Sequence, residues 1–123
     1  MRDLLVDYLA ERRPALGYVS LHKLSYTLGR LFWRDLELHH SGISSLGLPA
    51  DVARRWKERI ATKTRVVGGD GAVSRVSVPR VNAADHLMTV RAFYLDLTEW
   101  AVADPGRWGP WAHPSPVRAT EWE

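Results

Sequence analysis

The sequence predicts a mostly α-helical domain of four helices, with a small β-hairpin between the third and the fourth. Apolar residues recur every three or four positions in four separate segments, which is the spacing of one helix face. Residues 73–78 instead alternate as a strand does, after the glycine-rich residues 68–71. Six tryptophans, four tyrosines and two phenylalanines in 123 residues supply the apolar surface for a single core.

The first two helices are expected at residues 3–13 and 20–39. Pro14 ends the first, and Ser20 is the expected N-cap of the second. The second should end before Gly42, since glycine readily takes the left-handed conformation that closes a helix. Its apolar face is expected to consist of Leu21, Leu24, Leu28, Leu31, Phe32 and Leu38.

The third helix is expected to begin at Pro49, and the fourth after residues 82–85, which resemble a capping box. The fourth should end near Ala103, because the residue before Pro105 disfavours helical geometry. The buried stripe of the third is Val52, Trp56 and Ile60. That of the fourth is Leu87, Val90, Tyr94, Leu97 and Ala101, joined by Phe93 and Trp100.

Residues 1–104 are expected to form the helical domain, with the hairpin or loop 64–80 inserted into it. Residues 105–123 form a tail or linker rich in tryptophan and proline. Trp33, like Trp56 and Trp100, is expected in the core. Trp108 and Trp111 in the tail either pack back over the helices, which is the favoured interpretation, or dock against a following domain.

The composition argues against several classes of protein. Without cysteine there is no disulfide framework and no thiolate for zinc or catalysis, and the five histidines lack a metal-binding spacing. Carboxylates are scattered and no Ser/His/Asp arrangement is evident, so we expect neither a cofactor nor catalysis. A small enzyme that uses His86 with a nearby carboxylate is the weaker alternative. No apolar run approaches a membrane span or a signal peptide, which predicts a cytoplasmic protein without a membrane partner.

Positive charge is concentrated in one part of the chain. The net charge is +3, but residues 54–80 hold eight basic and two acidic residues, a net +6. The remaining nine basic and twelve acidic residues give −3. Such a field favours a polyanionic partner, and double-stranded DNA is the expected one.

Basic and hydroxyl side chains at helical spacing are the candidate DNA contacts. Guanidinium, ammonium and hydroxyl groups donate hydrogen bonds to phosphates and base edges. An ordinary solvent-exposed helix face is the alternative interpretation of each group. The candidates are Lys23, Thr27, Arg30 and Arg34 on the second helix, Arg55, Arg59 and Lys63 on the third, Arg65 in the hairpin, and His86 and Thr89 on the fourth.

Residues 24–33 (LSYTLGRLFW), 91–100 (RAFYLDLTEW) and 104–111 (DPGRWGPW) resemble the N-terminal core-binding region of tyrosine recombinases, the phage-type site-specific integrases. The resemblance extends over almost the whole chain. It implies a core-binding (SAM-like) four-helix bundle that clamps duplex DNA during integration and recombination. The catalytic residues would lie in a separate catalytic domain of the parent protein, whose motifs are not found here.

Two further interpretations stay open. The insertion at 64–80 is longer than a minimal core-binding domain needs, so it either reaches along DNA with Arg65 and Arg75 or touches another protomer. The alternative to DNA binding is a helical protein-interaction module, adaptor or antitoxin-like, that uses the Trp-rich tail.

Overall fold

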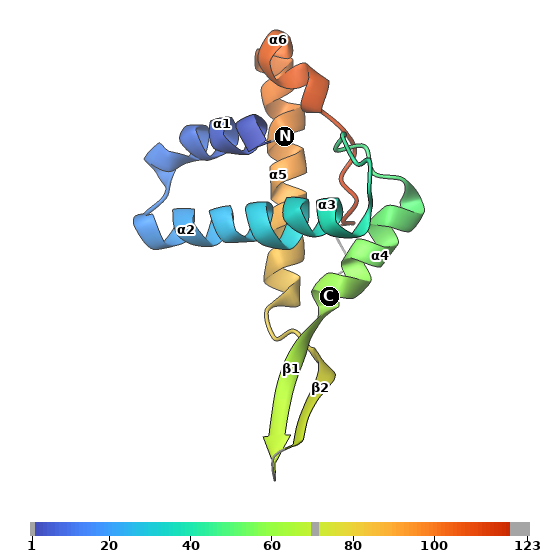
Figure 1. Ribbon diagram of the computed structural model, residues 1–123. Coiled ribbons are helices and arrows are strands. Elements are labelled where there is room, and N and C mark those ends of the chain that lie inside the picture. Colours follow the sequence, from blue (N-terminus) through green and yellow to red (C-terminus); the bar gives the residue numbers. More distant parts are fainter. Residues whose placement is uncertain (1, 70–71, 119–123) are drawn as a thin grey trace.

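Helix α5 (Ala83–Ala103) is the long axis around which the other helices are arranged (Figure 1). The computed structural model describes residues 2–69 and 72–118, apart from the side chains of residues 64–67, 69 and 72–74. The fold is mostly helical with one two-stranded antiparallel sheet, which confirms the predicted fold class. Besides α5, the elements are α1 (Arg2–Arg12), η1 (Arg13–Ala15), α2 (Tyr18–Tyr26), η2 (Thr27–Arg34), α3 (Asp35–His39), α4 (Ala50–Ala61), β1 (Thr62–Gly69), β2 (Ala72–Pro79), α6 (Pro105–Trp108) and η3 (Gly109–Trp111).

The second predicted helix is a continuous rod formed by α2, η2 and α3, and it crosses α5. It begins at Tyr18 with Gly17 as N-cap, so the prediction of a cap at Ser20 was wrong. Its end at His39 and the positive φ of Gly42 (86°) are as predicted. Its middle third, η2, is a π-helix, a form in which hydrogen bonds skip one residue more than in an α-helix. The apolar spacing did not predict it.

The boundaries of α4 and α5 lie close to the predicted ones. Helix α4 begins at Ala50, directly after Pro49, and its backbone becomes extended at Thr62. Helix α5 ends at Ala103 as predicted. The Asn82 side chain accepts no capping hydrogen bond, so the expected capping box does not form.

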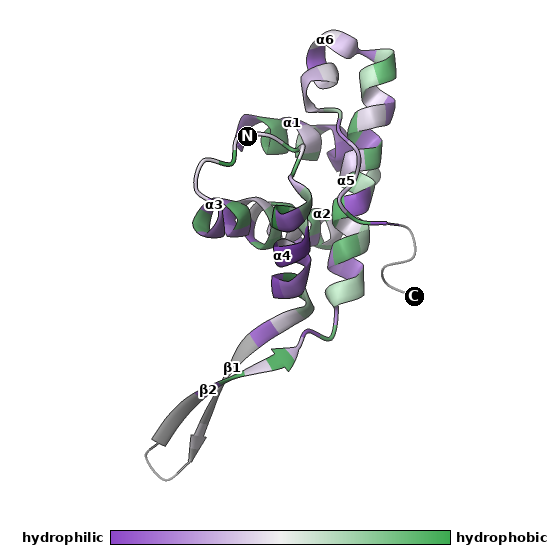
Figure 2. Ribbon diagram, turned by 90° about the vertical axis from the view of Figure 1, so that its right-hand side faces the viewer, coloured by the Kyte–Doolittle hydropathy of each residue, from purple (hydrophilic) through white to green (hydrophobic). Residues whose placement is uncertain are grey.

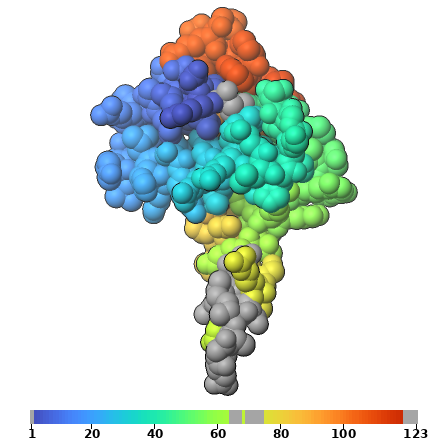
Figure 3. All heavy atoms as spheres, viewed as in Figure 1, coloured from blue at the N-terminus to red at the C-terminus, as the bar shows by residue number. Residues whose placement is uncertain are grey.

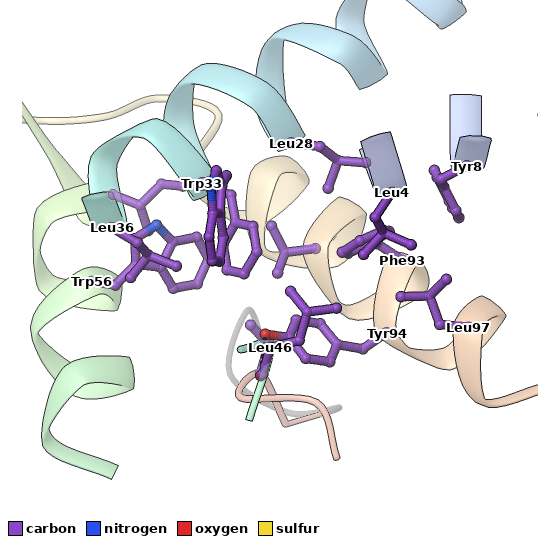
Figure 4. Close-up of a cluster of buried hydrophobic side chains, with 14 of the residues drawn as sticks. Leu4, Tyr8, Leu28, Trp33, Leu36, Leu46, Trp56, Phe93, Tyr94 and Leu97 are labelled. Atoms are coloured by element: carbon purple, nitrogen blue, oxygen red, sulfur yellow. Dashed lines mark hydrogen bonds between the residues drawn. The ribbon is translucent and has the colours of Figure 1, made fainter. Parts of the chain in front are cut away.

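The core is built around aromatic rings from four helices. Phe32 contacts Trp56 edge to face with ring centroids 5.2 Å apart, and Tyr8 contacts Phe93 in the same way at 4.8 Å. Figure 4 shows the core extending from Trp33 and Trp56 at one end to Tyr8 at the other. Trp33 and Trp56 are buried in the core cluster, and Trp100 packs against that cluster as a half-buried residue, as predicted.

One predicted core position is wrong. Leu38 is 72% exposed, whereas Leu36 is fully buried. Leu36 lies one turn after Phe32 and therefore shares its face, while Leu38 is half a turn further round the helix.

The hairpin projects from the helical body. Strands β1 and β2 pair antiparallel from Thr62↔Pro79 to Gly69↔Ala72, so the hairpin begins two residues before the predicted insertion. The backbone N–H of Arg80 donates to the Ala61 carbonyl at 2.8 Å, which joins the base of the hairpin to the end of α4. The expected turn at residues 68–71 lies partly outside the described residues.

The described part of the tail returns to the helices. Trp108 is 4% exposed and Val117 1% exposed, and both belong to the core cluster. Figure 3 shows α6 against α1 at the top of the molecule, where Arg107 pairs with Glu11 at 2.9 Å. Among the described residues, no helix has the length and apolar character needed to cross a bilayer.

Candidate nucleic-acid interface

A cleft of about 640 Å³ lies between α2, the base of the hairpin and the first turns of α5. These elements meet below α2 in Figure 1. Their approach is set by the short connection from β2 to α5, which places the hairpin base beside the N-terminal end of that helix. Five of the ten candidate DNA contacts line the cleft: Lys23, Thr27, Lys63, His86 and Thr89.

Cationic side chains dominate the cleft. Arg12, Lys23, Lys63 and Arg80 line it together with one carboxylate, Asp85, which leaves three net positive charges when the histidines are neutral. The four cations come from α1, α2, β1 and the connection before α5, so the fold gathers charges that are distant in the sequence. A cleft with one dominant sign of charge attracts a polyanion.

The cations of the cleft differ in how firmly they are held. Arg80 donates from Nε to the Ile60 carbonyl at 3.0 Å and from a terminal nitrogen to the Thr62 carbonyl at 3.4 Å. Its guanidinium is therefore fixed at the junction of α4 and β1. Lys23 and Lys63 are exposed, and their ammonium groups have no hydrogen bond or ion pair within the described part of the chain. These two lysines are free to meet a phosphate.

Thr27 and His86 form a buried pair in the wall of the cleft. The Thr27 hydroxyl and His86 Nδ1 are 2.9 Å apart, and the two residues are only 3% and 9% exposed. We expected both as exposed DNA contacts; instead they hold α5 against the rod of α2 and η2. Burial and then the charge of Arg80 lower the pKa of His86, while Asp85 opposes this shift. The imidazole is therefore neutral at neutral pH.

This burial predicts an acid-sensitive fold. The pKa of His86 is lowered from its usual 6.5, so the unfolded chain takes up a proton at a higher pH than the folded chain. The free energy of unfolding should therefore fall as the pH drops below about 6.5. Urea denaturation should show that the free energy of unfolding decreases less between pH 7.5 and pH 5 in His86→Asn than in the wild type. Replacement of the exposed His22 in the same cleft by asparagine should keep the wild-type decrease, and equal pH profiles for all three proteins would refute the neutral buried imidazole.

Thr89 and Arg59 are also engaged within the chain. The Thr89 hydroxyl donates to the Asp85 carbonyl of its own helix at 2.9 Å. Arg59 donates from two nitrogens to Asp35 Oδ1, at 2.9 and 2.7 Å, and a terminal nitrogen lies 3.0 Å from His40 Nε2. Arg59 thus joins α4 to α3 and is not a free cation.

The expected basic stripe on the third helix does not exist as a single face. Helix α4 ends at Ala61, so Lys63 lies on β1 and does not continue the helical repeat of Arg55 and Arg59. Arg30 and Arg34 on η2 and Arg55 on α4 are exposed but do not line the cleft. The Arg65 side chain lies outside the described residues.

Arg12 and Arg80 line the cleft although they were not among the candidates. Arg80 belongs to the positively charged segment 54–80, so the charge count contains its signal. Arg12 lies 3.8 Å from Asp96, which also accepts a 2.6 Å hydrogen bond from the Tyr8 hydroxyl. No local pattern links Arg12 to the cleft, because α1 meets α5 only through tertiary contacts.

Trp108, the first tryptophan of the tail, is engaged within the chain. Trp108 packs against Trp100 with ring centroids 5.1 Å apart, and the Arg107 guanidinium lies over the Trp108 ring, 4.5 Å from its centroid. Its indole is thus engaged inside the chain. Among the described residues, no three histidines or carboxylates are placed to hold a metal ion.

A scan of protein families, a search of curated proteins and a search of solved structures each found no match to this chain.

Proposed function

We propose that this chain binds duplex DNA through the basic cleft and serves as a non-catalytic, helical arm of a site-specific tyrosine recombinase. The observation that carries DNA binding is the convergence of Lys23, Lys63 and Arg80 from three separate elements onto one cleft. The first turn of α5 also lines this cleft, and the positive end of its helix dipole favours a phosphate there.

The recombinase assignment is supported by the sequence resemblance. Its segments supply the core residues Leu28, Phe32, Phe93 and Tyr94, together with the buried tail residue Trp108. The resemblance therefore concerns the packing of the arm, whereas the DNA contact depends on the cleft. In this proposal a catalytic domain of the parent protein cuts and joins the strands, and the chain acts in the cytoplasm without a cofactor.

The proposal predicts a loss of affinity for DNA when the charges of the two free lysines in the cleft are reversed. In Lys23→Glu with Lys63→Glu, the Kd for a labelled duplex should rise about 10- to 100-fold, because two phosphate contacts become repulsive. The slope of log Kd against log salt should fall by about 2. Fluorescence anisotropy at several salt concentrations measures both quantities.

Two matched variants locate the contact. Arg2→Glu with Arg118→Glu makes the same change in net charge at exposed positions outside the cleft, and it should keep nearly the wild-type Kd. Arg54→Glu with Arg55→Glu reverses the charge at two exposed positions of α4. If the α4 pair weakens binding and the lysine pair does not, the cleft is not the DNA site.

A further inference from the structure

Apolar side chains form a stripe along the solvent-facing side of α5. Met88, Leu95 and Val102 are 46, 48 and 82% exposed and follow one another at intervals of seven residues. Seven residues are close to two helical turns, so the three side chains lie on one line. The core residues of this helix lie on its opposite side: Val90, Phe93, Tyr94 and Leu97.

None of the helices α1–α4 lies on this side of α5. Figure 2 shows all four on the other side of α5, and the described part of the tail after η3 runs alongside α5. Other exposed apolar residues are isolated, such as Leu38 and Val81, or lie on the nine-residue helix α2, where Tyr18, Val19 and Tyr26 are exposed. The stripe is different because its three members are aligned on a regular helix of 21 residues.

Two unpaired charges are placed symmetrically about the centre of the stripe. Arg91 precedes Leu95 by four residues and Glu99 follows it by four. Neither side chain makes a hydrogen bond or an ion pair within the described part of the chain. The positive and negative charges therefore lie about one helical turn on either side of Leu95.

This symmetry favours a second α5 in antiparallel orientation. A two-fold axis at Leu95 brings positions equidistant from it to the same level of the pair. Arg91 of one copy is then level with Glu99 of the other, and Met88 is level with Val102. A parallel pair would instead align Arg91 with Arg91 and Glu99 with Glu99, which is repulsive at both levels.

We propose that the α5 stripe (Met88, Leu95 and Val102, flanked by Arg91 and Glu99) binds a second copy of this chain to form an antiparallel dimer. The proposal does not depend on DNA binding, because the stripe residues are absent from the lining of the basic cleft. A single helix pair is at the small end of stable interfaces, so the dimer should form with a Kd in roughly the micromolar range or above.

Sedimentation equilibrium over a range of protein concentrations tests the dimer. Leu95→Asp and Arg91→Glu should each raise the dimer Kd at least about tenfold, since the first buries a charge and the second pairs like charges. Adding Glu99→Arg to Arg91→Glu should restore association, because the attraction is rebuilt with reversed signs. Leu38→Asp, a change at an exposed leucine of α3, should have no effect. Circular dichroism checks that each variant folds. A wild type that stays monomeric up to millimolar concentration, or a double variant without rescue, would overturn the proposal.

Disulfide trapping tests the orientation. The chain has no cysteine, so each substitution introduces its only thiol. Leu95→Cys should form disulfide-linked dimers by itself, whereas Met88→Cys should cross-link much better with Val102→Cys than with itself. Efficient self-linking of Met88→Cys would indicate a parallel pair and refute the antiparallel one.

Discussion

Replacement of Trp56 by alanine should lower the free energy of unfolding by about 3–5 kcal/mol. Trp56 is fully buried, and its ring meets Phe32 edge to face. Its indole Nε1 donates to the Leu31 carbonyl at 2.9 Å, inside the π-helical segment η2. The alanine variant would leave a cavity between α4 and η2, and it would also leave that carbonyl without its indole partner.

Urea denaturation followed by circular dichroism measures this loss, and Trp56→Phe separates its two parts. Phenylalanine keeps most of the apolar volume but removes the N–H donor, so its cost should be clearly smaller than that of alanine. A cost below about 1 kcal/mol for the alanine variant would contradict the central position of Trp56 in the core.

The helices were predictable where the local sequence determines them. The stripe of Val52, Trp56 and Ile60 has the spacing of one helix face, and all three residues are buried in α4. Gly42 and Pro105 also act locally, through backbone geometry, and the helices before them end where predicted. Such signals need no knowledge of the rest of the chain.

The π-helix was not predictable in this way. Residues 27–34 have apolar positions that an ordinary α-helix would also bury. The carbonyl of Leu31 accepts a hydrogen bond from Trp56, which lies 25 residues further along the chain. The contacts that surround this segment are therefore tertiary, and a periodic pattern of residues does not encode them.

The candidate site was predictable in its chemistry but not in its geometry. The charge count and the helical spacing selected Lys23 and Lys63, which line the cleft. The same reasoning selected Arg59, which is paired with Asp35. A sequence shows how many cations a segment carries, but the partner of each cation depends on which helices pack together.

A second large loss of stability is expected from a substitution in the tail, because Trp108 is a core residue. Replacing Trp108 by alanine should lower the free energy of unfolding by about 3–4 kcal/mol. Trp108 is 4% exposed and packs against Trp100 with ring centroids 5.1 Å apart, so its loss opens a cavity between α5 and α6. Asp104 accepts a hydrogen bond from the backbone N–H of Arg107 and holds α6 in this place.

Thermal and urea denaturation of Trp108→Ala distinguish a structural tail from a linker. Arg107→Ala is the matched control in the same turn: its side chain is 44% exposed, and loss of its contacts with Glu11 and the Trp108 ring should cost at most about 1 kcal/mol. A linker that ran free of the helices would tolerate both substitutions equally. Similar small costs for the two variants would therefore show that α6 does not complete the core, whereas a large cost confined to Trp108 means that the folded domain extends beyond α5.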